Sequence, residues 1–138
     1  MQNGLLDTGP LVALLSRTDR FHERAKRLFA DLKPPLITCE AVLAETCYLV
    51  GKYAGAAGEV VELGRKGFYE IGLHIEDHFT EIRALLAKYG DQKISLADAC
   101  LIRLAEIRNE PNILTFDDDF RIYRWGGNRQ FSIPGTTL

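Results

Sequence analysis

The fold is best predicted from residues 4–15, which read Gly4-Leu5-Leu6-Asp7-Thr8-Gly9-Pro10-Leu11-Val12-Ala13-Leu14-Leu15. The apolar run at residues 4–6 is too short for a helix and fits a buried strand that ends at Asp7. Thr8 or Gly9 then fits the N-cap of a helix, because a proline is well tolerated in the first helical turn. The stretch therefore predicts a buried strand that passes directly into a helix, with an acidic residue at the junction.

Short strands and longer helices alternate along the rest of the chain. The predicted strands cover residues 4–6, 36–38, 69–75, 112–115 and 131–133. The predicted helices cover residues 8–15, 21–32, 42–49, 59–67, 77–89 and 95–107, with a short helix at 120–123. This alternation favours an α/β fold in which helices wrap a parallel sheet of short strands. Because no repeat, low-complexity segment or break in composition is present, residues 1–138 are expected to form a single domain.

Composition narrows the class of protein. Of the 138 residues, 46% are hydrophobic and 26% are charged, as is typical of a globular domain, and the net charge of -2 does not by itself indicate nucleic-acid binding. The three cysteines are odd in number and form no CxxC motif, which favours a reducing, cytoplasmic setting. We expect no signal peptide, and no apolar run approaches the roughly 18 residues that a membrane span needs.

Acidic residues follow two of the predicted strands. Asp7 comes directly after the first strand, and Asp117, Asp118 and Asp119 follow the strand that ends at Thr115. Ligands of open α/β sheets bind at the carboxyl ends of the strands, so these two acidic groups are expected to converge in space.

Two further acidic residues lie within predicted helices. Glu45 is close in helical spacing to Val42 and Leu49, so we expect it on an apolar stripe, where a carboxylate is costly unless a cation or proton compensates it. Asp98 opens the helix at 95–107. Each acid also has a simpler interpretation: Asp98 as a capping partner of Ser95, Asp7 and Asp117 as turn residues, and Glu45 as the partner of an arginine.

Together the acids favour a site for a hard divalent cation, since such cations prefer oxygen ligands and clustered carboxylates repel one another without them. The motifs also resemble a known family. Residues 7–15, the helix with Glu45, Ser95-Leu96-Ala97-Asp98-Ala99, and Leu114-Thr115-Phe116-Asp117-Asp118-Asp119-Phe120 look like the successive motifs of PIN domains, especially VapC-type toxins and their stand-alone relatives.

This resemblance implies a three-layer α/β/α fold and a metal-dependent ribonuclease, with Mg²⁺ or Mn²⁺ as the cofactor. It places the catalytic and metal-binding acids at Asp7, Glu45, Asp98 and Asp117, with Asp119 as an alternative or additional ligand. Thr8 or Thr115 would supply a supporting hydroxyl. One or two ions would activate water and stabilise the leaving oxygen, so no histidine or serine nucleophile is needed.

Three other interpretations remain to be compared with this one. A phospho-acceptor switch would also gather aspartates around Mg²⁺, but it needs a late lysine, and none follows Asp98. A catalytically silent PIN-fold module would bind RNA or protein without cleaving it. His74 and His78 have the spacing of two zinc ligands, but the glutamate of the zinc-protease motif is not in its place.

RNA binding would require cationic groups near the acids. Arg121, Arg124 and Arg129, with Trp125 among them, follow the last acidic motif and could combine phosphate contacts with base stacking. A second basic group between Arg17 and Arg27 could equally be a solvated helix face. The resemblance also implies a homodimer and a cognate antitoxin, for which the first helices could form the surface.

Overall fold

The computed structural model describes residues 4–134, and its main feature is a sheet of four parallel strands in the order β3-β2-β1-β4. The strands are β1 (Leu5–Leu6), β2 (Leu36–Thr38), β3 (Tyr69–Ile71) and β4 (Ile113–Leu114). The α-helices are α1 (Thr8–Leu15), α2 (His22–Ala30), α3 (Glu40–Val50), α4 (Ala56–Arg65), α5 (Phe79–Lys88) and α6 (Leu96–Arg108). Three short 3₁₀ helices are η1 (Ile75–His78), η2 (Gly90–Gln92) and η3 (Asp118–Arg121).

Successive residues of a strand point to opposite faces of the sheet, and here each face packs into its own hydrophobic core. Leu5, Ile37 and Ile113 pack into one hydrophobic core with residues of α6. Leu6, Leu36 and Leu114, their sequence neighbours, pack into a second core with residues of α1 and α4. This explains why the strands read as continuous apolar runs and not as alternating ones.

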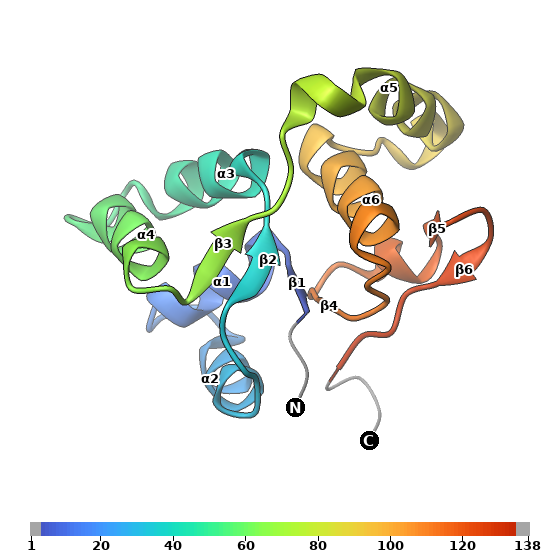
Figure 1. Cartoon of the computed structure of the whole chain (residues 1–138). Coiled ribbons are helices and arrows are strands. Elements are labelled where there is room, and N and C mark those ends of the chain that lie inside the picture. The colour runs from blue at the N-terminus through green and yellow to red at the C-terminus, as the bar shows by residue number, and fades with distance from the viewer. Residues whose placement is uncertain (1–3, 135–138) are drawn as a thin grey trace.

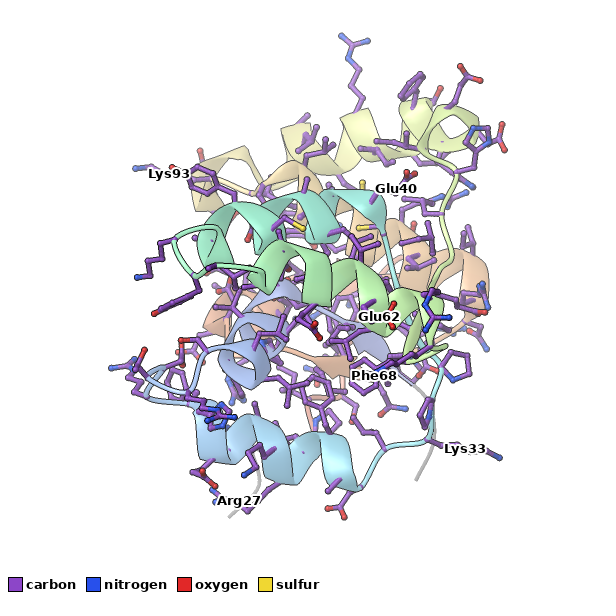
Figure 2. All side chains as sticks on the ribbon, turned by 90° about the vertical axis from the view of Figure 1, so that its left-hand side faces the viewer. Arg27, Lys33, Glu40, Glu62, Phe68 and Lys93 are labelled. Atoms are coloured by element: carbon purple, nitrogen blue, oxygen red, sulfur yellow. The ribbon has the colours of Figure 1, made fainter. Side chains whose placement is uncertain are left out.

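The helices form a layer on each face of the sheet. Figure 1 shows α1, α2 and α4 on one side of the strands and α5 and α6 on the other. α3 lies at the carboxyl end of the strands, where it contacts α1, α4 and α6. The view in Figure 2 places α2, with Arg27, at one edge of the molecule and α5 at the other. The predicted three-layer α/β/α fold with a parallel sheet is confirmed. None of the helices within residues 4–134 is long and apolar enough to span a bilayer.

The end of the chain differs from the prediction. A strand was expected at residues 131–133, but Ser132 makes only an isolated bridge to Asn112. The segment before it forms an antiparallel hairpin of β5 (Arg124–Trp125) and β6 (Arg129–Gln130). Gly126 and Gly127 supply the positive φ angles of its turn. Because the hairpin packs Trp125 into the core beside α6, that side chain is only 4% exposed.

Candidate active site

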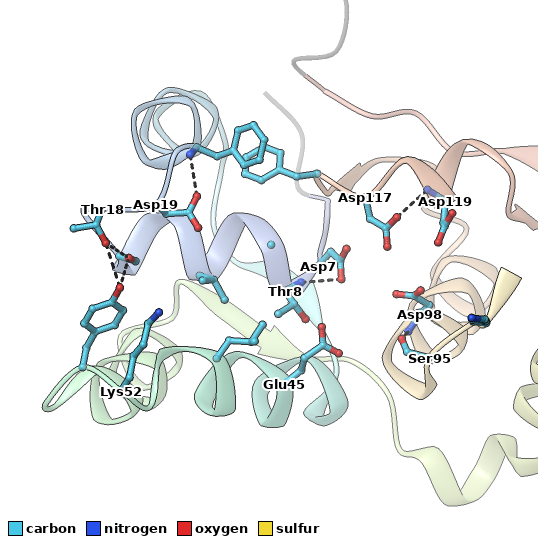
Figure 3. Close-up of a pocket in the computed structure, with 18 residues that line it drawn as sticks. Asp7, Thr8, Thr18, Asp19, Glu45, Lys52, Ser95, Asp98, Asp117 and Asp119 are labelled. Carbon is cyan, nitrogen blue, oxygen red and sulfur yellow. Dashed lines mark hydrogen bonds between the residues drawn. The ribbon is translucent and has the colours of Figure 1, made fainter.

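Acidic side chains from five segments of the chain line one pocket at the carboxyl end of the sheet. Figure 3 shows this cluster, which we call the acid pocket. Five of its six acids come from the end of β1, from α3, from α6 and from the segment that leads from β4 into η3; they are Asp7, Glu45, Asp98, Asp117 and Asp119. The sixth, Asp19, lies between α1 and α2 and accepts from the Phe21 amide. The structure therefore brings together all the acids that the sequence assigned to the cation site.

Asp7 is held in place by the sheet and by two hydrogen bonds to its carboxylate. Its backbone amide still donates to the Leu114 carbonyl, 3.0 Å away, so the side chain emerges where the strand ends. Oδ1 accepts from the Thr8 amide at 2.8 Å, and Oδ2 accepts from Thr115 Oγ1 at 2.7 Å. Asp7 is thus the N-cap of α1, in place of the predicted Thr8 or Gly9.

Thr115 links two acids of the pocket. While its hydroxyl donates to Asp7, its oxygen accepts a hydrogen bond from the Asp117 amide at 2.9 Å. Thr115 is buried, so this bridge fixes the start of the last acidic motif relative to the end of β1. The supporting position expected for Thr115 agrees with this geometry.

The carboxylate of Asp98 is bonded to Tyr123, whereas the capping interpretation paired Asp98 with Ser95. Ser95 caps α6, since its hydroxyl oxygen accepts from the Asp98 amide at 3.0 Å. The Asp98 carboxylate instead accepts a hydrogen bond from the hydroxyl of Tyr123, at 3.1 Å on Oδ2. The sequence analysis did not single out Tyr123 for this role, because residues 25 positions apart meet only through the tertiary fold.

Glu45 reaches the pocket for another reason than the one predicted. The buried side of α3 is formed by Val42, Thr46 and Val50, whereas Leu49 is 46% exposed. Glu45 is itself exposed and lies on the side of the helix that borders the acid pocket. The expected desolvation of Glu45 on an apolar stripe is therefore wrong, although its position beside the other acids agrees with the proposed site.

The three consecutive aspartates have different positions. Asp117 and Asp119 line the acid pocket, and Asp117 Oδ1 accepts from the Asp119 amide at 2.9 Å as η3 begins. Asp118 does not line it; its side chain is 94% exposed and pairs with Arg121. The charge of Asp117 contributes to the raised pKa values of both Asp7 and Asp98, which favours Asp117 as a close member of the cluster.

Burial and the neighbouring negative charges raise the pKa values of Asp7 and Asp98, so these two acids are harder to ionise. Burial raises the pKa of Asp7 to about 7; the charges of Asp98 and Asp117 add to the rise, and the bonds from Thr115 and Thr8 oppose it. Burial likewise raises the pKa of Asp98 to about 6, with contributions from Asp117 and Glu45. Burial also raises the pKa of the Tyr123 hydroxyl, with Asp98 contributing, so the hydroxyl stays protonated and donates. The pocket thus concentrates negative charge that a cation would stabilise.

The chemistry of the pocket fits a hard divalent cation. All the acids offer carboxylate oxygens, and the buried hydroxyl of Thr8, on the pocket wall, has no hydrogen-bond partner within residues 4–134. In that same part of the chain, no three His, Cys, Asp or Glu side chains lie close enough to bind a metal ion directly. Mg²⁺ typically takes only one or two carboxylates and keeps several waters, so the open arrangement suits a cation held partly through water.

The residues predicted to contact RNA are mostly engaged in structure. Trp125 cannot stack on a base because it is buried, and its indole donates to the Gln130 carbonyl. Arg124 donates to the backbone carbonyls of residues 121–123, and Arg129 donates to Asn109 and lies over the Trp125 ring. Of these four residues, Arg121 alone lines a pocket next to the acids.

The structure also gives the positions of the two histidines with zinc-like spacing and of pocket residues that were not predicted. His74 pairs with Asp77, and His78 accepts from Arg103; neither belongs to a group of three His, Cys, Asp or Glu side chains within residues 4–134 that could hold a zinc ion. Lys52, Lys93 and the aromatic rings of Phe21 and Phe116 line the acid pocket and were not predicted there. Their position depends on loops whose path the sequence pattern does not define.

The chain is similar in sequence and in fold to known PIN-domain proteins. The family model described as PIN domain matches residues 4–126. Ribonuclease VapC26 of Mycobacterium tuberculosis is 27% identical over 115 residues, which cover 82% of this chain and 85% of the relative. The crystal structure of Mycobacterium tuberculosis VapC20, described as a Sarcin-Ricin loop cleaving toxin, superposes with a TM-score of 0.72 at 26% identity, over 83% of this chain and 90% of that one. The chain therefore belongs to the PIN domain family and is similar to its VapC-type members.

Proposed function

We propose that the chain is a divalent-cation-dependent endoribonuclease and the toxin of a toxin–antitoxin pair. The main support is the convergence of five acidic side chains in one pocket of a PIN domain. The relatives support the same activity, because VapC26 is named a ribonuclease and VapC20 is described as a Sarcin-Ricin loop cleaving toxin.

The proposed cofactor is Mg²⁺ or Mn²⁺. The residues that would hold it are Asp7, Glu45, Asp98 and Asp117, with Asp119 as a further ligand. When bound, such a cation offsets the charge of the carboxylates and the phosphodiester and makes an attacking water more acidic. No histidine lines the acid pocket, and its two serines have structural roles: Ser95 caps α6, and Ser16 bonds to Thr18.

The residues around the acids orient them and control their protonation. The Thr8 amide and the Thr115 hydroxyl each donate to one oxygen of Asp7, and Tyr123 donates to one oxygen of Asp98. These bonds orient the two carboxylates, and a carboxylate oxygen that accepts one hydrogen bond still has a lone pair for a ligand. Because the pKa of Asp7 is raised to about 7, part of this carboxyl is protonated at neutral pH. Cation binding should therefore release a proton and strengthen as the pH rises.

The proposed partners are RNA, an antitoxin and a second copy of the chain. α3 and α4 expose large apolar side chains, including Tyr48 at 84% and Val61 at 63%, which suits a protein partner. Light scattering of the purified chain should give twice the mass of one copy; the mass of a single copy would contradict the dimer.

We place the protein in the cytoplasm, where RNA is present and Cys39, Cys47 and Cys100 would stay reduced, as they are here.

Labelled RNA incubated with the purified protein tests the activity. We expect cleavage with Mn²⁺ or Mg²⁺ and none in excess EDTA, with activity restored when the cation is returned. Binding of the RNA without cleavage under any of these conditions would indicate the silent module instead. Cleavage that continues undiminished in excess chelator would contradict the proposed role of the cation.

A further inference from the structure

The acid pocket extends beyond its acids, along the whole length of α1. Asp7 and Ser16 cap the two ends of α1, and both line the pocket. At the rise of an α-helix these two caps lie roughly 13 Å apart. We call the part of the pocket lined by Ser16, Thr18, Lys52 and Tyr53 its far end. Figure 3 shows Thr18 and Lys52 well away from Asp7, so the pocket has room for more of a bound chain than the bond at the acids.

Tyr53, in the turn that follows α3, is held at the far end by its hydroxyl. Ser16 Oγ donates to Tyr53 Oη at 3.4 Å, and Thr18 Oγ1 shares a hydrogen bond of 3.2 Å with the same oxygen. These bonds tie the turn to the end of α1, so the ring has a fixed place although the residue is 38% exposed. The ammonium of Lys52 lies 5.3 Å from the ring centroid and covers one face, which leaves the other face for a ligand.

The pocket wall between the acids and Tyr53 is apolar. It is lined by Val12 of α1 and Leu49 of α3. Leu49 lies four positions after Glu45, one helical turn closer to Tyr53, and is strongly exposed for a leucine. Binding sites for small organic groups combine such apolar walls with a few polar groups. This stretch of the pocket therefore suits a flat and largely apolar group.

The charges at the far end do not favour a phosphate. Asp19 lines the pocket together with Lys52 and opposes its charge. The C-terminal end of α1, at Ser16, also carries a partial negative charge. A neutral part of an RNA chain suits this position better than an anion does. The neutral parts are the ribose and the base, and only the base has a flat face that can stack on a ring.

We propose that the far end of the acid pocket binds a nucleobase that flanks the cleaved bond, stacked on the ring of Tyr53 and packed against Leu49. Tyr53 is then a positioning residue for the substrate. This inference rests on the proposed ribonuclease function. Proteins commonly bind RNA by stacking unpaired bases on aromatic side chains. A base held at the far end would fix the path of the chain along α1 and bring the bond to be cleaved to the acids.

RNA binding by two Tyr53 variants tests the proposal. The probe is a fluorescent RNA that the protein cleaves in Mn²⁺, titrated at several salt concentrations with Ca²⁺ in place of Mn²⁺. We expect Tyr53→Ala to raise Kd about tenfold, within the range found when a base-stacking ring is removed. The slope of log Kd against log salt should stay unchanged, because no phosphate contact is lost. Tyr53→Phe keeps the ring and should stay much closer to the original Kd.

A spectroscopic signature separates stacking from a structural role of Tyr53. The probe RNAs carry a fluorescent adenine analogue at one position at a time, and the emission of this analogue falls when it stacks. One position should lose emission on binding to the original chain and to Tyr53→Phe, but not on binding to Tyr53→Ala. A residue that only tied the turn after α3 to α1 through its hydroxyl would lose as much function in Tyr53→Phe as in Tyr53→Ala.

A matched control and a kinetic measurement complete the experiment. Phe79 is an exposed aromatic residue of α5 that does not line the acid pocket, and Phe79→Ala should leave Kd unchanged. In Mn²⁺, Tyr53→Ala should raise KM while kcat changes by less than about threefold, since the residue contacts a base that does not react.

Three results would overturn the inference and leave the proposed function intact. The first is an original Kd in Tyr53→Ala of a protein that cleaves RNA, which would leave the far end to another ligand, such as a peptide of a protein partner. The second is an equal loss in Tyr53→Phe, and the third is an equal loss in Phe79→Ala. If the unmodified protein cleaves no RNA with any cation, the proposed function itself fails, and the role of Tyr53 fails with it.

Discussion

Asp98→Asn is expected to lower the rate of RNA cleavage at saturating Mn²⁺ by about 100- to 1000-fold. The substitution removes a negatively charged oxygen from the proposed cation site while keeping the shape of the side chain. A cation contributes several kcal/mol to the stabilisation of a charged transition state, and each 1.4 kcal/mol lost is about tenfold in rate. The amide oxygen can still accept from Tyr123, so the fold should be unaffected.

Asp77→Asn is the matched control for this experiment. Asp77 lies in η1, is 68% exposed and pairs with His74, and it does not line the acid pocket. Its variant should cleave RNA at the original rate. If Asp98→Asn also stays within a few-fold of the original rate, Asp98 does not belong to the cation site.

Asp7→Asn is expected to make the metal-free protein more stable at neutral and alkaline pH. The folded chain raises the pKa of Asp7 to about 7, mainly by burial, while an aspartate in the unfolded chain has a pKa of about 3.9. Between these values the folded state binds more protons than the unfolded state. The contribution of Asp7 to the free energy of unfolding is therefore most favourable below about pH 4 and is lost as the pH rises through about 7.

The asparagine variant removes this decrease because it has no charge to bury. One pKa unit corresponds to about 1.4 kcal/mol, so the rise in pKa corresponds to at most about 4 kcal/mol of destabilisation above pH 7. Water penetration and relaxation reduce that value, and we expect the variant to be more stable by about 1 to 3 kcal/mol at pH 8. In a domain of this size this raises Tm by several degrees.

Thermal melts in EDTA between pH 4 and 8 check this expectation, with Asp77→Asn as the control that should follow the original chain. Addition of Mn²⁺ should stabilise the original chain by about 2.7 kcal/mol at a hundred times Kd, and the Asp7→Asn variant much less. An Asp7→Asn protein that melts several degrees lower in EDTA, yet gains as much from Mn²⁺, would identify Asp7 as a structural cap of α1 only.

The fold and the position of the acidic site could be predicted from the sequence wherever the local pattern of apolar residues and the chemistry of the acids agree. The run from Gly4 to Leu15 predicted a strand, an acid at its end and a helix, and the structure contains all three. The parallel sheet followed from short apolar strands that alternate with helices. Convergence of the acids followed from their places at strand ends and helix starts, because the topology brings those places to one edge of the sheet.

The errors have physical causes that can be named. Glu45 was expected on a buried stripe because Leu49 was taken as the next core residue, whereas α3 continues its buried side through Val50. Trp125 was expected on the surface because the Gly126-Gly127 pair, a strong hairpin signal, was not used.

Other features could not be predicted from local pattern at all. The hydrogen bond from Tyr123 to Asp98 joins α6 to the segment after η3, and the bond from Thr115 to Asp7 spans 108 positions. The pocket lined by Arg27 and Arg121 likewise requires α2 to lie beside η3, which spacing within either segment does not indicate. Such contacts arise only when the layers have packed.

The central claim, that RNA cleavage depends on a cation bound by the acid pocket, is tested most directly by a Mn²⁺ titration. Bound Mn²⁺ is measured by electron paramagnetic resonance, and RNA cleavage is measured in the same samples, for the original chain, Asp98→Asn and Asp77→Asn. We predict that cleavage rises in proportion to bound Mn²⁺ in the original chain and in Asp77→Asn, and that both signals are lost together in Asp98→Asn. Cleavage at full rate in samples that contain no bound Mn²⁺ would contradict the claim.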